Sequence, residues 1–177
     1  MPIIETALGV ENAFDIARSS GDVVAIAIGL EDLTADLGVQ RSAEGKESLY
    51  ARTRLINAAK AAGIQPIDSV FADVDDPDAL RQNVQESKAL GFEGMGCIHP
   101  RQIAVIREGF APGREEIGKA SRIVSAFGEA RRMGLGVVAL GTKMIDQPVV
   151  SRAQKTITLA ISMGLLPPDW NEKITSE

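Results

Sequence analysis

Two adjacent carboxylates, Glu31 and Asp32, follow an apolar run near the amino end of the chain, and Asp36 comes four residues later. The run VVAIAI, residues 23–28, has the length and β-branched content of a buried parallel strand. Acidic side chains at the carboxyl end of such a strand must be solvated, paired or bound to a cation. Ligands of α/β proteins bind at this end of the sheet, so Glu31 and Asp32 are candidate site residues. Asp36 is expected to be a local cap or a supporting residue.

A matching carboxylate, Glu5, ends the short apolar stretch PIIE at residues 2–5. Glu5 and Asp32 are 27 residues apart, about one strand–helix–strand repeat. On neighbouring parallel strands, about 4.8 Å apart, the two carboxylates would repel each other unless a cation lay between them. Mg²⁺, with oxygen ligands at about 2.1 Å, fits such a pair and leaves positions for water or substrate. The alternative, that both are ordinary polar loop residues, stays open at this point.

Bulk composition narrows the class of protein. The 177 residues suffice for a domain with a real core, and 19 Lys and Arg against 24 Asp and Glu give a net charge of −5. Without a basic run, and with 4% aromatic residues, nucleic acid is not an expected partner. The single cysteine, Cys97, excludes an internal disulfide. No apolar stretch reaches the roughly 18 residues of a membrane span, and no basic flank of a secretory signal is visible, so we expect a cytoplasmic protein without membrane contact.

Strands and helices are predicted to alternate through the first 112 residues. Strands are expected at residues 2–5, 23–28, 64–71 and 92–98, and helices at residues 9–19, 47–62, 77–90 and 101–109, while residues 33–46 form a loop with or without a short helix. In the helix over residues 47–62, Leu49, Tyr50, Ile56 and Ala59 are expected to face inward. The alternation of strands and helices, at about 30 residues per unit, indicates a parallel sheet. Its size and rhythm are those of half an eightfold (β/α) barrel.

The pattern changes after residue 112. A long amphipathic helix is predicted over residues 114–132, a short strand pair within 135–145, a further helix over 148–163, and a tail anchored by Trp170. We therefore expect two domains. Residues 1–112 form a TIM-barrel-type half with the metal site, and residues 113–177 form a C-terminal helical arm.

His99 and Cys97 lie at the end of the fourth predicted strand. Pro100 suits the first position of a helix, whose amino terminus would point at the barrel mouth, where phosphate groups are held. His99 is thus a candidate for binding the tail of coenzyme A or phosphopantetheine, although a purely structural turn histidine remains an alternative. Cys97 is expected to be a buried strand thiol.

Four motifs in order, PIIETALGV, GLEDLTADLG, GFEGMGCIHPRQI and MIDQPVVSRAQ, resemble the citrate lyase β-subunit family, the CitE-like branch of the HpcH/HpaI aldolase superfamily. The likeness covers nearly the whole chain. It implies a (β/α)₈ barrel fold of which this chain holds strands 5–8 and the C-terminal arm. Members of the family are usually longer, and their substrate-binding arginine lies in the half that has no counterpart here.

The resemblance also implies a function. The family cleaves or forms a carbon–carbon bond next to a thioester of the citryl, malyl or citramalyl type. It implies that Glu5 and Asp32 bind Mg²⁺, that the backbone N–H groups of Glu31 and Asp32 receive the oxoacid carboxylate, and that Asp146 reaches into a neighbouring subunit's active site as an acid. The implied partners are an acyl thioester, a missing barrel half or other lyase subunits, and further copies of the chain in a trimer or hexamer.

Two other functions remain open. The first is a catalytically silent scaffold or regulatory subunit with the same fold, and the second is a pyruvate-dependent aldolase of the wider superfamily. The presence of Glu5, Asp32 and Asp146 favours an enzyme, because a scaffold does not need them. The GLEDLTADLG and MIDQPVV segments favour a thioester lyase over the aldolase.

Overall fold

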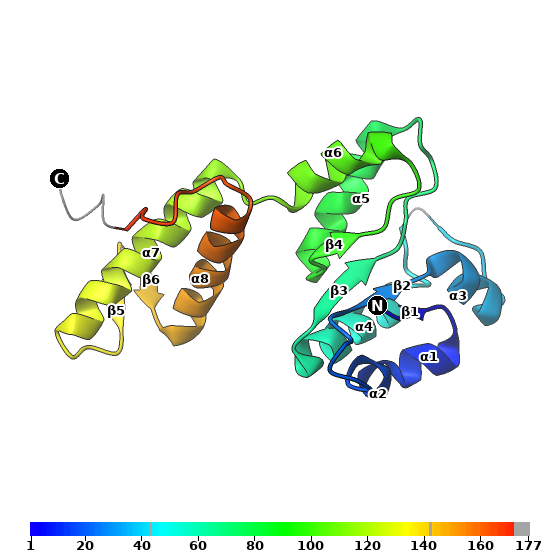
Figure 1. The fold of residues 1–177 in the computed structure, drawn as a ribbon, viewed down its shortest axis with the longest axis horizontal. Coiled ribbons are helices and arrows are strands. Elements are labelled where there is room, and N and C mark those ends of the chain that lie inside the picture. The colour runs from blue at the N-terminus through cyan, green and yellow to red at the C-terminus, as the bar shows by residue number, and fades with distance from the viewer. Residues whose placement is uncertain (43, 142, 172–177) are drawn as a thin grey trace. The chain divides into compact units, whose positions relative to one another are not determined.

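The computed structural model describes residues 1–42, 44–141 and 143–171, without the side chains of residues 138 and 143. The chain divides into two compact units, Met1–Phe110 and Ala111–Glu177, each with its own core (Figure 1). No helix in the described part of the chain is long and apolar enough to cross a membrane.

The first unit is built on a four-stranded parallel sheet in the order β1-β2-β3-β4. The strands are β1 (Ile3–Ile4), β2 (Ala25–Ile28), β3 (Gln65–Asp68) and β4 (Gly94–Met95). Each strand pairs with the next one in the chain, with Ile4 opposite Ile28 and Ala27 opposite Ile67. The predicted parallel sheet is confirmed, although every strand is shorter than the apolar pattern suggests.

Six helices accompany this sheet: α1 (Ala7–Glu11), α2 (Ala13–Ala17), α3 (Leu30–Leu37), α4 (Leu49–Ala62), α5 (Pro77–Leu90) and α6 (Pro100–Phe110). The strongest local signals are confirmed. Asp76 caps α5 by accepting from the N–H of Ala79, and Gly91, with φ of 113°, ends that helix. The helix predicted over residues 9–19 is instead two short helices that meet at Asn12.

One face of the sheet is packed under helices. Successive side chains of a strand point to opposite faces, and Ile4, Ile26 and Ile28 belong to one buried cluster with residues of α1, α2 and α4. A smaller cluster joins Met95 of β4 to α5 and α6. We call this side, which also carries Asp68, the helix-covered face.

The opposite face carries Ile3, Ala25, Ala27, Gln65 and Ile67, which alternate with the residues of the helix-covered face. Ile3 is 54% exposed, and the small Ala25 and Ala27 are buried without joining the main core cluster. Gln65 is exposed and Ile67 is only half-buried. We call this side the open face, since no helix of the first unit's core cluster packs on its strands.

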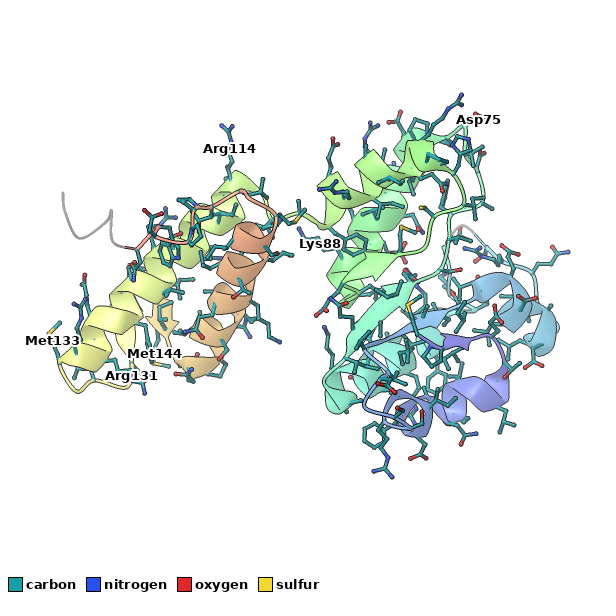
Figure 2. All side chains as sticks on the ribbon, viewed as in Figure 1. Asp75, Lys88, Arg114, Arg131, Met133 and Met144 are labelled. Carbon is teal, nitrogen blue, oxygen red and sulfur yellow. The ribbon has the colours of Figure 1, made fainter. Side chains whose placement is uncertain are left out.

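The second unit is a helical pair with a hairpin. Helices α7 (Arg114–Arg132) and α8 (Gln147–Ser162) pack along each other, and the antiparallel strands β5 (Val138–Leu140) and β6 (Lys143–Ile145) lie between them in the chain (Figure 1). Trp170 packs against this core, as predicted. Met144 is exposed on β6 (Figure 2). The predicted helix boundaries here agree with the structure to within a residue.

Two predictions of burial are wrong. The expected inward face of α4 included Leu49 and Tyr50, but both are exposed, and the buried face instead includes Arg52. Cys97 is an exposed free thiol beyond the short strand β4. In both cases the apolar side chain wrongly indicated burial, because residues distant in the sequence decide which side of a helix or strand is covered.

Candidate functional site

The carboxylate of Glu5 lies against the backbone of Gly29. The pairing of Ile4 with Ile28 brings the ends of β1 and β2 together, and the N–H of Gly29 donates to the carbonyl of Ile4 at 2.9 Å. A Cβ atom added to Gly29 would lie 2.6 Å from Oε1 and 2.7 Å from Cγ of Glu5. Only glycine therefore leaves room for the Glu5 side chain where it is. Glu5 belongs to the open face, at its carboxyl edge.

Helix α3 begins at Leu30, so Glu31 and Asp32 lie in its first turn and not in a loop. Gly29 is the N-cap residue, and its carbonyl accepts from the N–H of Leu33 at 3.1 Å. The N–H groups of Glu31 and Asp32 have no hydrogen-bond partner among the described residues. The positive end of the helix dipole favours negative charge at this point. Glu5, Glu31 and Asp32 thus gather at one end of the sheet, as the spacing predicts.

Two exposed polar contacts hold α3 at its two ends. Nη1 of Arg41 lies 2.6 Å from Oε1 of Glu31, and Oδ2 of Asp36 accepts from the N–H of Ala7 at 2.7 Å. Asp36 therefore caps the start of α1, the helix that follows Glu5. The expected local cap at Asp36 is wrong, because the helix that Asp36 contacts lies 29 residues away in the chain.

A buried ion pair lies beneath this edge, on the helix-covered face. Arg52 of α4 donates from Nη2 to Oδ2 of Asp68 at 2.6 Å and from Nη1 to Oε1 of Glu86 at 2.7 Å. Ser87 of α5 donates to the same Asp68 oxygen, and the guanidinium stacks on the ring of Phe92 at 5.6 Å. Arg52 and Asp68 are each 3% exposed.

Burial alone would lower the pKa of Arg52, but the hydrogen bond and negative charge of Asp68, followed by those of Glu86, outweigh it and raise the pKa. Arg52 therefore stays charged under all ordinary conditions. A small polar cavity of about 30 Å³ adjoins the pair and is also lined by Leu30 and Ser69. This polar interior is the part of the site that the sequence reasoning missed.

Ser69 connects the buried pair to α3. Its Oγ accepts from the N–H of Leu30 at 3.1 Å, and its own N–H donates to Oδ1 of Asp68 at 2.9 Å. Gly29 and Ser69 are two residues of the candidate site whose positions in the sequence were informative, although their contacts were not. Gly29 ends the apolar run two residues before Glu31, and Asp68 and Ser69 lie at the carboxyl end of β3.

His99 supports the start of α6. Its Nδ1 accepts from the N–H of Arg101 at 3.2 Å, and its carbonyl accepts from the N–H of Gln102 at 3.0 Å. Gln102 is buried and bridges the N–H of Ile98 to the carbonyl of Phe71. These contacts give His99 the structural role that was kept as the alternative, and Nε2 is the nitrogen left for a ligand. Binding of a coenzyme tail by His99 remains a prediction.

Asp146 lies in the second unit, at the start of α8. Its Oδ1 accepts from the N–H of Val149 at 3.3 Å, so the carboxylate is an N-cap. The exposed residue Met144 precedes it on β6. This arrangement places Asp146 at the junction of hairpin and helix, where it is half-buried. Its predicted action as an acid remains a prediction.

The chemistry of the donors fits a hard divalent cation. Carboxylate oxygens are the ligands that Mg²⁺ prefers, and Mg²⁺ commonly uses one or two carboxylates and keeps several waters. Among the described residues, no group of three or more His, Cys, Asp or Glu side chains could hold a metal. That Glu5 and Asp32 hold such a cation, with its remaining positions taken by water or substrate, remains a prediction.

Comparisons with known proteins agree on one family. Residues 1–100 match the family model described as HpcH/HpaI aldolase/citrate lyase. The chain is 40% identical over 171 residues to the citrate lyase subunit beta of Leuconostoc mesenteroides subsp. cremoris, covering 97% of this chain and 57% of that protein. It is 38% identical over 171 residues to the human mitochondrial citramalyl-CoA lyase, covering 92% of this chain and 50% of that protein.

A solved structure supports the fold. The CitE protein of Mycobacterium tuberculosis, in complex with magnesium, acetoacetate and coenzyme A, superposes with a TM-score of 0.76 at 32% identity. The match covers 89% of this chain and 59% of that one. The chain thus spans about half the length of the relatives that it matches.

Proposed function

Because the chain belongs to the HpcH/HpaI aldolase/citrate lyase family, we propose that it provides the metal-binding part of a Mg²⁺-dependent carbon–carbon lyase. The substrate class is a hydroxyacyl thioester of the citryl, malyl or citramalyl type, and the products are an oxoacid and an acyl thioester. Support comes from the names of the two relatives and from the magnesium and coenzyme A bound to the CitE structure.

The observation that carries this proposal is the placement of Glu5 over Gly29. It puts a carboxylate beside the amino terminus of α3, whose first turn bears Asp32 and two free backbone N–H groups. One position thus offers oxygen ligands for a cation and donors for an anion. A substrate with a carboxylate next to a hydroxyl needs both.

The reaction divides among these groups. In the cleavage direction the substrate hydroxyl loses its proton to a water molecule, its carbon becomes the carbonyl of the oxoacid, and the electron pair of the broken bond passes to the thioester as an enolate. Glu5 and Asp32 would hold Mg²⁺, which would supply positive charge near the oxygens on which negative charge develops. The N–H groups of Glu31 and Asp32 orient the oxoacid carboxylate, and Asp146 returns a proton to the enolate carbon.

Removing one carboxylate at a time tests the metal site. Glu5→Gln and Asp32→Asn each delete a charged ligand from a site with few protein ligands, so either change should abolish measurable Mg²⁺ binding while the fold is kept. Asp22→Asn is the control, because it removes an exposed carboxylate from the turn before β2. Calorimetric titration with MgCl₂ gives the affinities. Undiminished binding in both site variants would exclude the pair as ligands.

The finer fold assignment is also a proposal: β1 to β4 correspond to strands 5–8 of a (β/α)₈ barrel, and residues 113–177 form an arm for oligomer contacts. The exposure of Ile3 on the open face supports it. Without the other strands, the 177-residue chain should self-associate or lose sharp aromatic packing, since sheet edges and an apolar face remain uncovered. Light scattering and near-ultraviolet circular dichroism measure this. A well-packed monomer would contradict the assignment.

The action of Asp146 in a neighbouring copy can be tested by mixing. Asp146→Ala and Asp32→Asn, each in a protein with its complete barrel, should be inactive alone. Mixed oligomers should regain part of the activity, because some sites combine an intact metal pair with an intact Asp146. If mixing restores nothing, Asp146 acts within its own chain or only caps α8. If the unmodified complete protein binds Mg²⁺ without lyase activity, the scaffold alternative is correct.

A further inference from the structure

The first N–H group of α3 is bound by a side chain from another strand. Leu30 donates to Oγ of Ser69 at 3.1 Å, across 39 residues of sequence, and the contact is buried. A helix of this length would normally satisfy its first turn with its own N-cap side chain. Here the N-cap is Gly29, which has no side chain to offer.

The choice of Gly29 and Ser69 determines which N–H groups stay available. A Ser, Thr, Asp or Asn at the N-cap accepts from the second or third N–H of the helix, which in α3 belong to Glu31 and Asp32. Ser69 instead takes the first N–H, and the other two have no hydrogen-bond partner in the described part of the chain. An N-cap side chain at position 29 would also collide with Glu5. The start of α3 is thus held by a residue outside the helix, and the N–H groups of Glu31 and Asp32 are not used for this contact.

Ser69 is itself held by the buried pair. Its N–H donates to Oδ1 of Asp68 at 2.9 Å, and Arg52 binds the same oxygen through Nε at 3.3 Å and the other oxygen through Nη2 at 2.6 Å. Ser69, Asp68 and Arg52 are at most 6% exposed. A buried network that is fully hydrogen-bonded is rigid. The position of Ser69 Oγ is therefore set by Arg52 on α4 and Asp68 on β3.

We propose that Ser69 is a positioning residue for the anion-binding turn of α3, with Arg52 and Asp68 holding it in place. This inference rests on the proposed function, since it assigns the free N–H groups of Glu31 and Asp32 to the carboxylate of the oxoacid. Ser69 does not touch the substrate. It fixes the register and direction of the turn that does.

Ser69→Ala tests the placement, and Ser87→Ala is its matched control. Both serines are buried and hydrogen-bonded to Asp68, but only Ser69 reaches α3. Amide hydrogen exchange, measured by NMR, gives the protection factor of the Leu30 amide. In Ser69→Ala this factor should fall by roughly tenfold or more, in addition to any fall seen for the slowest core amides. In Ser87→Ala, Leu30 should change only as much as those core amides do. Unchanged protection of Leu30 in Ser69→Ala, or equal loss in the control, would overturn the proposal.

Titration with sodium pyruvate in the presence of MgCl₂ tests the consequence for a ligand. In the unmodified protein the amide signals of Glu31 and Asp32 should shift on binding, and Ser69→Ala should raise the dissociation constant by roughly tenfold. The control should stay within about twofold. Equal affinities in the unmodified protein and Ser69→Ala would overturn the positioning role. A complete lack of binding by the unmodified protein would refute the proposed function, while the exchange of Leu30 still decides whether Ser69 holds α3.

Discussion

The two faces of the sheet in the first unit are in different states. On the helix-covered face Ile4, Ile26 and Ile28 are at most 2% exposed, whereas Ile3, adjacent to Ile4 in β1, is 54% exposed on the open face. The difference arises from the period of two along a strand, which gives successive side chains opposite environments. The helices of the first unit therefore cover one face of the sheet and leave the other face uncovered.

The candidate site lies where these two faces meet at the carboxyl edge. Glu5 belongs to the open face, while Asp68 belongs to the helix-covered face, and Gly29 and Ser69 connect them through the start of α3. The Glu5 carboxylate and the start of α3, which are proposed to bind the ligand, thus adjoin both the buried network and the open face. Four predictions test this comparison, from the largest expected effect to the smallest.

The largest effect is expected at Asp68. Asp68→Ala leaves Arg52 buried with only the half-exposed Glu86 as an ionic partner, which should lower the free energy of unfolding by about 3 kcal/mol or more. Asp78→Ala removes an exposed partner of Arg81 and should cost at most about 1 kcal/mol. Urea unfolding measures both. Equal costs would show that the buried pair adds nothing to the helix-covered face.

A pair of isoleucines compares the faces directly. Ile26→Ala should cost about 2–5 kcal/mol, since Ile26 is fully buried in the main core cluster. Ile3→Ala should cost about 0.5 kcal/mol, because its side chain is largely in solvent. Urea unfolding of the two variants of the 177-residue chain, at concentrations low enough to prevent self-association, gives the two costs. A large cost at Ile3 would mean that another surface covers the open face in solution.

Gly29→Ala should affect function more than stability. The added methyl group would displace the Glu5 side chain, so the affinity for Mg²⁺ should fall by roughly tenfold or more, with a stability change of about 1 kcal/mol or less. Gly21→Ala is the control, since open space surrounds that position before β2. Calorimetry with MgCl₂ and urea unfolding separate the two effects. Normal Mg²⁺ affinity in Gly29→Ala would show that the position of Glu5 does not matter for the metal.

The smallest effect is expected at Glu47, an exposed counterpart to Asp68. Hydrogen bonds from the side chain and the backbone N–H of Ser42 lower the pKa of Glu47 in the folded state. A lowered pKa contributes stability above the unfolded pKa, and this contribution is lost as the pH falls through the folded pKa. Glu47→Gln should therefore cost at most about 1 kcal/mol at pH 7, and the difference should shrink below about pH 4. Urea unfolding at both pH values checks this, and a constant difference would contradict it.

Local signals made much of the fold predictable. The Asp76-Pro77 start of α5, the glycine that ends it and the amphipathic pattern of α7 depend on neighbours within a few residues, and all three are confirmed. The carboxylates at the sheet edge also followed from spacing, because a parallel repeat has a nearly fixed length. Their role as metal ligands remains a prediction.

Features that depend on distant partners could not be read from the sequence. Arg52 looks like a solvent-facing residue on a helix until Asp68, 16 residues away, is seen beside it. Leu49 and Tyr50 look like core residues, but both side chains are exposed and neither belongs to the main cluster. The Ser69 contact with Leu30 is of the same kind, since no local pattern indicates that a helix borrows its cap from the next strand.

The order of the strands has a consequence for how the first unit folds. Each pairing in the described sheet joins strands that are consecutive in the chain, and no later strand is inserted between earlier ones. Each pairing closes a loop of one strand–helix–strand repeat, and the entropic cost of closing a loop rises with its length. The sheet can therefore assemble one repeat at a time along the chain. Dividing such a chain between two repeats would cut one strand pairing and leave every other pairing within a single piece.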